Sequence, residues 1–174
     1  MSFSLETERL RLRPWCGDDL DNLHRLMADP VVMRWLPSDP VEEVEGCRPT
    51  LERILGLQER EGWAFWPVVE RDGDRFVGDC GLKPLPDTDE IELGYHFVPD
   101  VHGRGYAPEA ARAVLAHGFE ERGLERIVAV AVPENRASWR VMEKVGMRRV
   151  EDRVAYGLET VCYALTADEW RALP

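Results

Sequence analysis

Residues 90–122 read EIELGYHFVPDVHGRGYAPEAARAVLAHGFEER, and this stretch decides the fold. Residues 90–98 predict a β-strand, because β-branched and aromatic side chains dominate them. Residues 108–122 predict an α-helix, because their apolar side chains recur at helical spacing. Gly103 and Gly105 lie between the two segments, where glycine permits backbone conformations that other residues avoid. The stretch therefore predicts a strand, a glycine loop and a helix in direct succession.

The loop itself, HGRGYA at residues 102–107, predicts an anion site. Its glycines allow several backbone N–H groups to face one direction, and the following helix aims the positive end of its dipole at the same point. Arg104 adds a fixed positive charge. A phosphate or pyrophosphate would fit this cradle, whereas the alternative is a tight turn that needs glycine only for its geometry. Two nucleotide-binding motifs fit poorly, since the Walker GK[ST] is missing and Pro108 replaces the third glycine of a dinucleotide-binding fingerprint.

The order of the remaining elements predicts a mixed α/β fold. Antiparallel strands come first and a strand–helix–strand crossover follows, so the sheet should be mostly antiparallel with one parallel or splayed pair and flanking helices. At 174 residues the chain is expected to form one domain over residues 1–174. The predicted strands are residues 9–13, 63–70, 75–82, 90–98, 126–132, 147–154 and 158–165.

Capping residues and prolines predict where the helices begin. The first begins at Asp18 or Asp19 and ends near Asp29-Pro30, and the second begins at Asp39-Pro40 and is bent or broken by Pro49. A capping box, Thr166-x-x-Glu169, opens a short last helix. The helices between them are expected at residues 108–122 and 135–145.

Charge and composition exclude several classes of function. The net charge is −11, and residues 1–100 carry 22 acidic against 11 basic side chains, which argues against a nucleic-acid partner. No apolar run approaches the roughly 18 residues of a membrane span, and the first residues lack an export signal, so a cytoplasmic protein is expected. Its four cysteines form no CxxC pair, which predicts reduced thiols and no metal site.

A second polar constellation lies about 30 residues after the glycine loop. Asn135, Ser138 and Met142 share one face of the predicted helix at 135–145. Asn135 and Ser138 could hydrogen-bond an amide-bearing cofactor. The alternative is that Asn135 is a helix cap and that Ser138 is incidental.

Together the two constellations resemble the GCN5-related N-acetyltransferase (GNAT) superfamily. Its coenzyme A loop, [Q/R]-x-x-G-x-[G/A], corresponds to residues 102–107, and its later N-x-x-[A/S]-x-x-L-Y-x-K-x-G-F motif corresponds to residues 135–147. The segments TERLRLR at 7–13, ELGY at 92–95 and GYAPEA at 105–110 resemble the branch that holds the ribosomal-protein N-terminal alanine and serine acetyltransferases. The resemblance covers nearly the whole chain and implies a single GNAT-like domain that uses acetyl-CoA.

The resemblance also implies the residues that hold the cofactor. The strand at 90–98 should bulge at its end and turn backbone N–H groups toward the pantetheine and the acetyl carbonyl. His102 departs from the usual Gln or Arg, and Met142 stands where many members have a tyrosine that protonates the leaving thiolate. The implied cofactor-binding residues are Phe97, Val98, His102, Gly103, Arg104, Gly105, Tyr106, Ala107, Asn135, Ser138 and Lys144.

Catalytic roles follow from the same resemblance. Glu92 lies six residues before Val98, which matches the catalytic glutamate of the histone-acetylating members, and a partly desolvated carboxylate there would have a raised pKa. His96 shares its face and is the rival base. Ser138 would replace the missing tyrosine as the acid for the thiolate.

The implied reaction is direct acetyl transfer to a primary amine, either a protein N-terminus or a small amine. Trp35 and Tyr95 are the predicted linings of the acceptor pocket. A homodimer is one implied oligomeric state. A catalytically silent acyl-CoA-binding sensor or interaction protein on the same fold is the alternative function.

Overall fold

The computed structural model describes residues 3–62 and 64–174 and contains one mixed sheet. Trp63, which was predicted to begin a strand, lies outside these residues. The strand order is β1-β2-β3-β4-β5-β6-β9-β7, with β8 paired to β9. The strands are β1 (Leu5–Glu6), β2 (Leu10–Leu12), β3 (Ala64–Glu70), β4 (Phe76–Pro84), β5 (Ile91–Phe97), β6 (Arg126–Ala131), β7 (Arg148–Arg149), β8 (Arg153–Ala155) and β9 (Leu158–Thr166).

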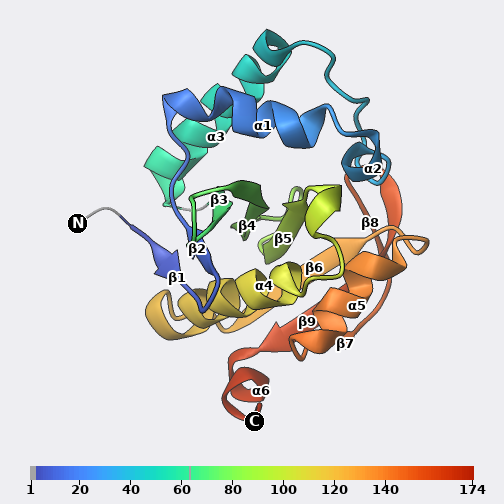
Figure 1. The fold of residues 1–174 in the computed structure, drawn as a ribbon. Coiled ribbons are helices and arrows are strands. Elements are labelled where there is room, and N and C mark those ends of the chain that lie inside the picture. Colours follow the sequence, from blue (N-terminus) through green and yellow to red (C-terminus); the bar gives the residue numbers. More distant parts are fainter. Residues whose placement is uncertain (1–2, 63) are drawn as a thin grey trace.

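Helices cover both sides of this sheet (Figure 1). Helices α1 and α3 lie on one side of β2–β5, and α4 lies on the opposite side. Strands enclosed in this way lose the alternation of buried and exposed residues, and almost every residue of β4 is buried. The helices are α1 (Leu20–Met27), α2 (Pro30–Met33), α3 (Arg48–Glu61), α4 (Tyr106–Ala116), α5 (Arg136–Lys144) and α6 (Ala167–Arg171).

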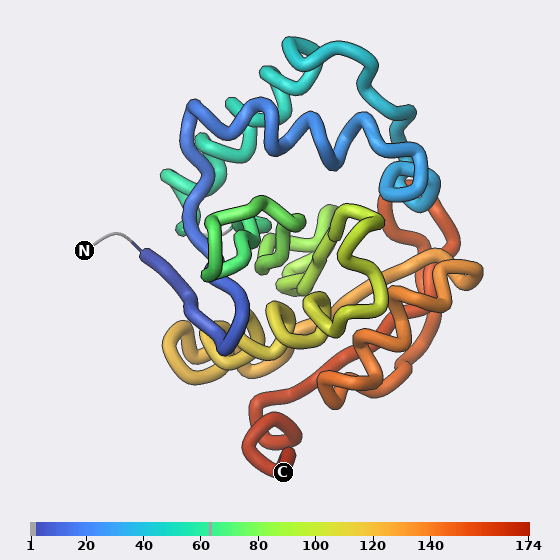
Figure 2. The backbone as a smooth tube through the Cα atoms, in the orientation of Figure 1, coloured from blue at the N-terminus to red at the C-terminus, as the bar shows by residue number. Residues whose placement is uncertain are grey.

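Strands β5 and β6 form the predicted parallel pair, and they are in register at a single pair of residues, Glu92 and Val128. Strand β6 pairs with β9 over six residues, from Arg126 to Ala131, so its other edge is fully used. From Glu92 toward Phe97, β5 and β6 therefore separate. Figure 2 shows the chain leaving β5 at this open end and turning through the loop into α4. The splayed parallel pair predicted from the sequence is confirmed.

The predicted second helix is wrong in its first part. No helix begins at Asp39-Pro40, and a 3-10 turn at Val44–Cys47 leads instead into α3. Pro49 lies in the first turn of α3, where the missing N–H costs nothing, so this proline starts a helix instead of breaking one. The first helix ends at Met27, near the predicted Asp29-Pro30. Asp29 also caps α2, because its carboxylate accepts hydrogen bonds from the Val31 and Val32 backbone.

The C-terminal half differs from prediction in two places. The strand predicted at 147–154 is split into β7 and β8, which both pair with β9. Helix α4 begins at Tyr106 and ends at Ala116, and a π-helical turn at His117–Glu121 completes the segment predicted as one helix. The capping box of Thr166 and Glu169 is confirmed at the start of α6.

A buried ion pair ties β2 to the start of α1. Arg13 donates to both carboxylate oxygens of Asp19 at 2.6 and 2.7 Å, and the Asp19 side chain is 3% exposed. Burial raises the pKa of Asp19, but hydrogen bonds from Arg13, Asn22 and Cys16 outweigh burial and lower it to about 2. The folded state therefore favours the ionised carboxylate.

This lowered pKa predicts a pH-dependent stability. The contribution of Asp19, about 2 kcal/mol, should be present above its unfolded pKa of about 4 and lost as the pH falls toward 2. In urea unfolding, Asp19→Asn should therefore be less stable than the unmodified protein by the full Asp19 contribution at pH 7 and by roughly half of it at pH 3. Asp152→Asn is the control, because the Asp152–Arg149 pair is half exposed. A deficit independent of pH would contradict the assignment.

Candidate acyl-transfer site

Backbone N–H groups without protein partners gather at the start of α4. Gly103 and Gly105 have φ of 79° and 80°, in the left-handed region, and Gly105 is the N-cap of α4. Among the described residues, no hydrogen bond occupies the N–H groups of Gly103, Gly105, Tyr106 or Ala107. The loop residues 102–105 are exposed. A helix N-terminus with free N–H groups and a favourable dipole binds anions, so the predicted cradle is formed.

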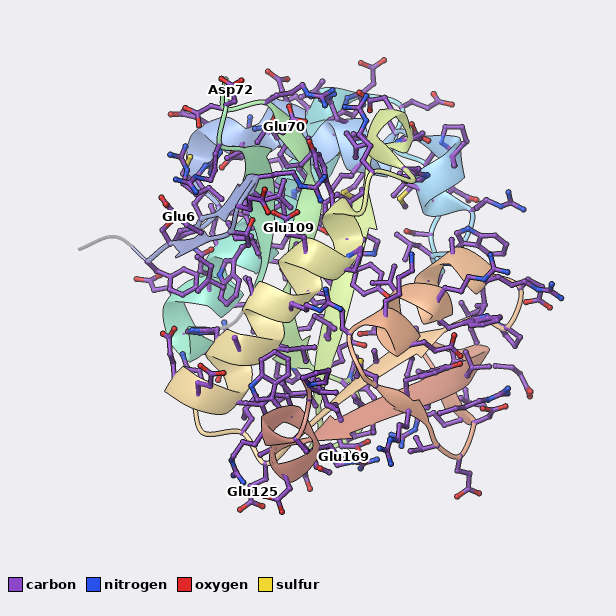
Figure 3. The ribbon with its side chains drawn as sticks, turned by 60° about the horizontal axis from the view of Figure 1, so that its bottom comes forward. Glu6, Glu70, Asp72, Glu109, Glu125 and Glu169 are labelled. Carbon is purple, nitrogen blue, oxygen red and sulfur yellow. The ribbon has the colours of Figure 1, made fainter. Side chains whose placement is uncertain are left out.

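Arg9, from the β1–β2 connection, contacts both this loop and the first turn of α4. Its guanidinium pairs with Glu109 of α4, donates to the Arg104 carbonyl at 2.9 Å and lies 4.7 Å from the centre of the Tyr106 ring. Thr7 donates to the same Glu109 carboxylate at 2.6 Å. Figure 3 shows Glu109 on the first turn of α4, beside β1 and β2. The sequence motif at 7–13 indicated a family likeness but not this contact, which spans about a hundred residues.

His102 fixes the end of β5 to the loop. Its Nε2 lies 2.8 Å from the Phe97 carbonyl oxygen, which can only accept, so Nε2 carries the proton. The predicted bulge at the end of β5 is absent, because β4 and β5 pair without a register shift as far as Gly78 and Phe97. The Val98 N–H is also not free, since it donates to the Val77 carbonyl at 3.0 Å. Hydrogen-bond direction alternates along an antiparallel strand, so the Phe97 N–H faces the open side toward β6.

Two hydroxyl groups, one from β5 and one from α5, lie close together beside the gap between β5 and β6. The Tyr95 hydroxyl donates to the Ser138 carbonyl at 2.7 Å and lies 3.2 Å from Ser138 Oγ. Tyr95 therefore reaches α5 from the face of β5 opposite to Glu92. Its part in an acceptor pocket stays a prediction. Asn135 is the N-cap of α5 and accepts from the Ser138 N–H, and Met142 is buried. The cap interpretation of Asn135 is thus confirmed.

Lys144 lies at the far end of α5, beside an open hollow of about 1020 Å³. Arg112 of α4 donates to the Lys144 carbonyl at 2.7 Å and lines the same hollow, as does Arg171. Three basic side chains therefore border a space next to the C-terminal ends of α4 and α5. Glu92 does not border this hollow, so the hollow and the candidate catalytic carboxylate occupy different parts of the molecule.

On the α1–α3 side of the sheet, strand register builds three rows of side chains across β3, β4 and β5. Lys83 pairs with Glu92, Gly81 pairs with Gly94, and Asp79 pairs with His96. Phe65 of β3 pairs with Gly81, in the middle row. A Cβ on Gly94 would lie 2.2 Å from the Phe65 ring, so this glycine leaves the room in which the ring lies over the sheet. The ring separates the first row from the third.

Glu92 is buried in the first row and has two partners. Lys83 Nζ lies 3.3 Å from Glu92 Oε1, and the Tyr156 hydroxyl, from the β8–β9 turn, donates to the same oxygen. Burial raises the pKa of Glu92, and the Lys83 and Tyr156 contacts oppose that rise without cancelling it. Burial and the Glu92 charge also raise the pKa of Tyr156, so its hydroxyl stays protonated. The raised pKa expected for this carboxylate is present.

His96 in the third row is held by a buried carboxylate. Its Nδ1 lies 2.8 Å from Asp79 Oδ1, and the Asp79 side chain is 8% exposed. Burial lowers the pKa of His96, but the charge and the hydrogen bond of Asp79 together outweigh burial and raise it above its usual value. The prediction that Glu92 and His96 share one face of β5 is confirmed by their common side of the register.

Trp35 lies on the turn after α2, half-buried, with the Arg34 guanidinium 4.2 Å from its ring centre. Its part in an acceptor pocket stays a prediction. Within residues 3–62 and 64–174, no group of three or more His, Cys, Asp or Glu side chains is placed to hold a metal ion. In the same ranges, no helix is both long and apolar enough to cross a membrane.

Known proteins share this arrangement. The family model for the acetyltransferase (GNAT) domain matches residues 9–148. The uncharacterized N-acetyltransferase YnaD of Bacillus subtilis (strain 168) is 31% identical over 172 residues, which cover 95% of this chain and 98% of that protein. A crystal structure of a GNAT-family acetyltransferase from Bacillus anthracis superposes with a TM-score of 0.82 at 31% identity, covering 95% of this chain and 99% of that one.

A third likeness concerns the fold alone. RimL, the ribosomal L7/L12 alpha-N-protein acetyltransferase in complex with coenzyme A, superposes with a TM-score of 0.81 at 18% identity, covering 96% of this chain and 99% of that one. The GNAT fold uses acetyl-CoA, and the related proteins carry the name N-acetyltransferase. The domain match spans most of the chain and agrees with the glycine loop, the splayed strands and the buried carboxylate. The chain is therefore an N-acetyltransferase that belongs to the GNAT family.

Proposed function

We propose that this protein transfers an acetyl group from acetyl-CoA directly to a primary amine, which is a protein N-terminus or a small amine. One observation carries the proposal. A buried carboxylate with a raised pKa, Glu92, lies where β5 and β6 part, and the same strand leads into an exposed loop with free N–H groups. The loop with free N–H groups suits a polyphosphate, and the surroundings of Glu92 suit an amine that must lose a proton.

The residues present fit acetyl-CoA. The N–H groups of Gly103, Gly105, Tyr106 and Ala107 would hold its pyrophosphate, because they lack protein acceptors. Arg104 would add positive charge, and Phe97 would offer its N–H on the open side of β5. Lys144, which was also predicted to bind the cofactor, lies at the far end of α5 beside Arg112 and has no part in this proposal. Val98, His102 and Asn135 would act indirectly, since the N–H of Val98 and the side chains of His102 and Asn135 already bond to protein atoms. When bound, acetyl-CoA supplies an acyl group activated as a thioester.

Glu92 would accept the proton of the acceptor ammonium, directly or through a water molecule. Because its pKa is raised, Glu92 is a stronger base than an exposed carboxylate and is closer in basicity to the amine. Tyr156 lies on an exposed hairpin turn, so its hydroxyl can leave Glu92 when an acceptor arrives. His96, oriented by Asp79, is the second candidate base.

Ser138 and Tyr95 would supply the proton that the leaving thiolate needs. Met142 offers no acidic hydrogen at the place of the usual tyrosine, whereas the Tyr95 hydroxyl lies 3.2 Å from Ser138 Oγ. Burial raises the pKa of Tyr95, so its hydroxyl remains a neutral donor. The two hydroxyls would therefore relay one proton, from Tyr95 on β5 to Ser138 in the first turn of α5 and from there to the thiolate.

The acidic first hundred residues suit a cationic acceptor, and Trp35 is the proposed outer wall of its pocket. If charge steers a basic amine to the site, KM should rise with salt. Four free cysteines, three of them buried, agree with the proposed cytoplasmic location. A homodimer remains part of the proposal.

Acetyl-CoA should raise the melting temperature by about 5 °C or more at 100 times its Kd, while ATP and NAD leave it unchanged. Release of free thiol with a panel of amines and N-terminal peptides then identifies the acceptor class. If acetyl-CoA binds and no amine releases thiol, the silent acyl-CoA sensor is the better description. If ATP or NAD stabilises the protein and acetyl-CoA does not, the proposed function is wrong.

A further inference from the structure

Lys83 holds its ammonium in a cage of aromatic and acidic groups. Its Nζ lies 3.3 Å from Glu92 Oε1, 4.8 Å from the centre of the Phe65 ring and 4.9 Å from the centre of the Tyr156 ring. The side chain is 27% exposed. A carboxylate and two aromatic faces are the groups that recognise a cationic amine. Lys83 therefore occupies, from within the chain, a place suited to an acceptor amine.

The choice of lysine at this position matters chemically. The chain has 22 basic residues of the Lys and Arg types, and only Lys83 and Lys144 are lysines. Apart from two histidine–carboxylate pairs, arginine makes the other ion pairs to carboxylates in the described part of the chain, for example Arg13 with Asp19 and Arg75 with Glu70. A guanidinium cannot lose its proton in a protein, whereas an ammonium can and then becomes a nucleophile. Lys83 is thus able to react where an arginine could only pair.

The position of Lys83 in the sheet places it at the gap. Lys83 is the register partner of Glu92, and Glu92 is the residue at which β5 and β6 make their single parallel pairing. The ammonium therefore touches the proposed base at the point where the strands part. An amine already held on the base, with no need to diffuse, has a large advantage of proximity.

We propose that Lys83 is a self-acetylation site, at which the enzyme acetylates its own Nζ when no other amine is present. The inference rests on the proposed function. Glu92 takes one proton from the Lys83 ammonium, and the freed Nζ lone pair forms a C–N bond to the acetyl carbonyl carbon. The C–S bond of the thioester breaks, and its electron pair leaves with sulfur, which is protonated through Ser138. The sum is one Nε-acetyl-lysine, one coenzyme A thiol and one proton released to water.

Acetylation would change the site itself. It removes the positive charge that opposes the rise in the Glu92 pKa, so the pKa of Glu92 should rise further. The added acetyl group also fills the space between Phe65 and Tyr156. The modified enzyme is therefore expected to be less active toward external amines, and the modification limits the enzyme when acceptors are scarce.

The test incubates the full chain with acetyl-CoA and no amine, followed by intact mass and peptide mapping. Lys144, which is exposed, measures the background of chemical acetylation in the same molecule. Lys83 should gain its acetyl group on the order of 100-fold faster than Lys144, and Glu92→Gln should reduce the Lys83 rate to the Lys144 rate. In protein unfolded by urea, acetyl-CoA should modify Lys83 and Lys144 at similar rates. The Lys83→Arg variant should show no acetylation at position 83.

Two results would overturn the inference. Lys83 acetylated no faster than Lys144 in the folded protein would mean ordinary chemical modification, and a Lys83 rate unchanged in Glu92→Gln would mean that the proposed base plays no part. The outcome separates from that of the proposed function. If external amines are acetylated while Lys83 stays unmodified, only the self-acetylation is wrong, whereas failure of both reactions with acetyl-CoA bound points to the silent sensor.

Discussion

Glu92→Gln is expected to lower kcat for amine acetylation on the order of 100-fold or more and to leave the fold intact. The amide keeps the shape of the carboxylate and can still contact Lys83 and Tyr156, but it cannot accept a proton. Since acetyl-CoA contacts other residues, its KM should change little. Steady-state release of thiol, measured beside circular dichroism of each variant, checks both parts of this expectation.

Glu90→Gln is the matched control for this substitution. Glu90 lies two residues away on the chain, just before β5, and pairs with Arg126 of β6 and Arg153 of β8. The same chemical change there should cost some stability and leave kcat nearly unchanged. Equal losses of kcat in the two variants would show that charge near β5, and not the proton acceptor at Glu92, controls the rate.

The pH profile separates Glu92 from His96. A base must be unprotonated, so activity should fall as the pH drops through the raised pKa of the acting residue. If Glu92 acts, that limb disappears in Glu92→Gln and is unmoved by Asp79→Asn. If His96 acts, Asp79→Asn removes the charge that raises the His96 pKa, so the limb moves to lower pH. The second pattern would identify His96, and not Glu92, as the base.

The glycine loop could be predicted from the sequence because its determinants are local. Gly103 and Gly105 adopt the positive φ that only glycine reaches without strain, and the helix they open follows at once. The raised pKa of Glu92 was predicted on a different basis, because the family resemblance implied a partly desolvated carboxylate at this position. Only for the loop do the neighbours along the chain fix the environment.

Contacts set by register could not be predicted in this way. Tyr156 lies 64 residues from the Glu92 that it contacts, and Phe65 reaches the site only because Gly81 and Gly94 fall opposite it. A shift of one residue in either ladder would turn these side chains to the other face. Tyr95 shows the same limit, since its contact with Ser138 of α5 joins residues that are 43 positions apart in the chain.

The prediction of a helix break at Pro49 is wrong for a related reason. A proline in an apolar periodic stretch indicates a break only when the helix has already begun, and nothing local determined that α3 starts at Arg48. The segment between Asp39 and Glu43 forms no helix although it begins with a favourable cap. Packing of the 3-10 turn at Val44–Cys47, with Cys47 fully buried, positions the true start. Tertiary burial overrides capping preference here.

The second large effect is expected at the glycine loop. Gly103→Ala should raise the Kd of acetyl-CoA about tenfold or more, because alanine at φ near 80° is strained and the loop relaxes away from the conformation that aligns its N–H groups. A Cβ at Gly103 meets nothing within 4 Å, so the effect comes from the backbone and not from a clash. Isothermal titration with acetyl-CoA measures the change.

The chain offers a closely matched control at Gly73, in the turn between β3 and β4. Gly73 has φ of 81° and likewise has open space at its Cβ position, so Gly73→Ala carries the same backbone strain at a different place. Both variants should lose about 1–2 kcal/mol of stability, and only Gly103→Ala should lose affinity for acetyl-CoA. A loss of affinity in both would trace the effect to general destabilisation. Unchanged affinity in both would remove the glycine loop from the cofactor site, since a cradle of aligned N–H groups cannot tolerate a change in the conformation that aligns them.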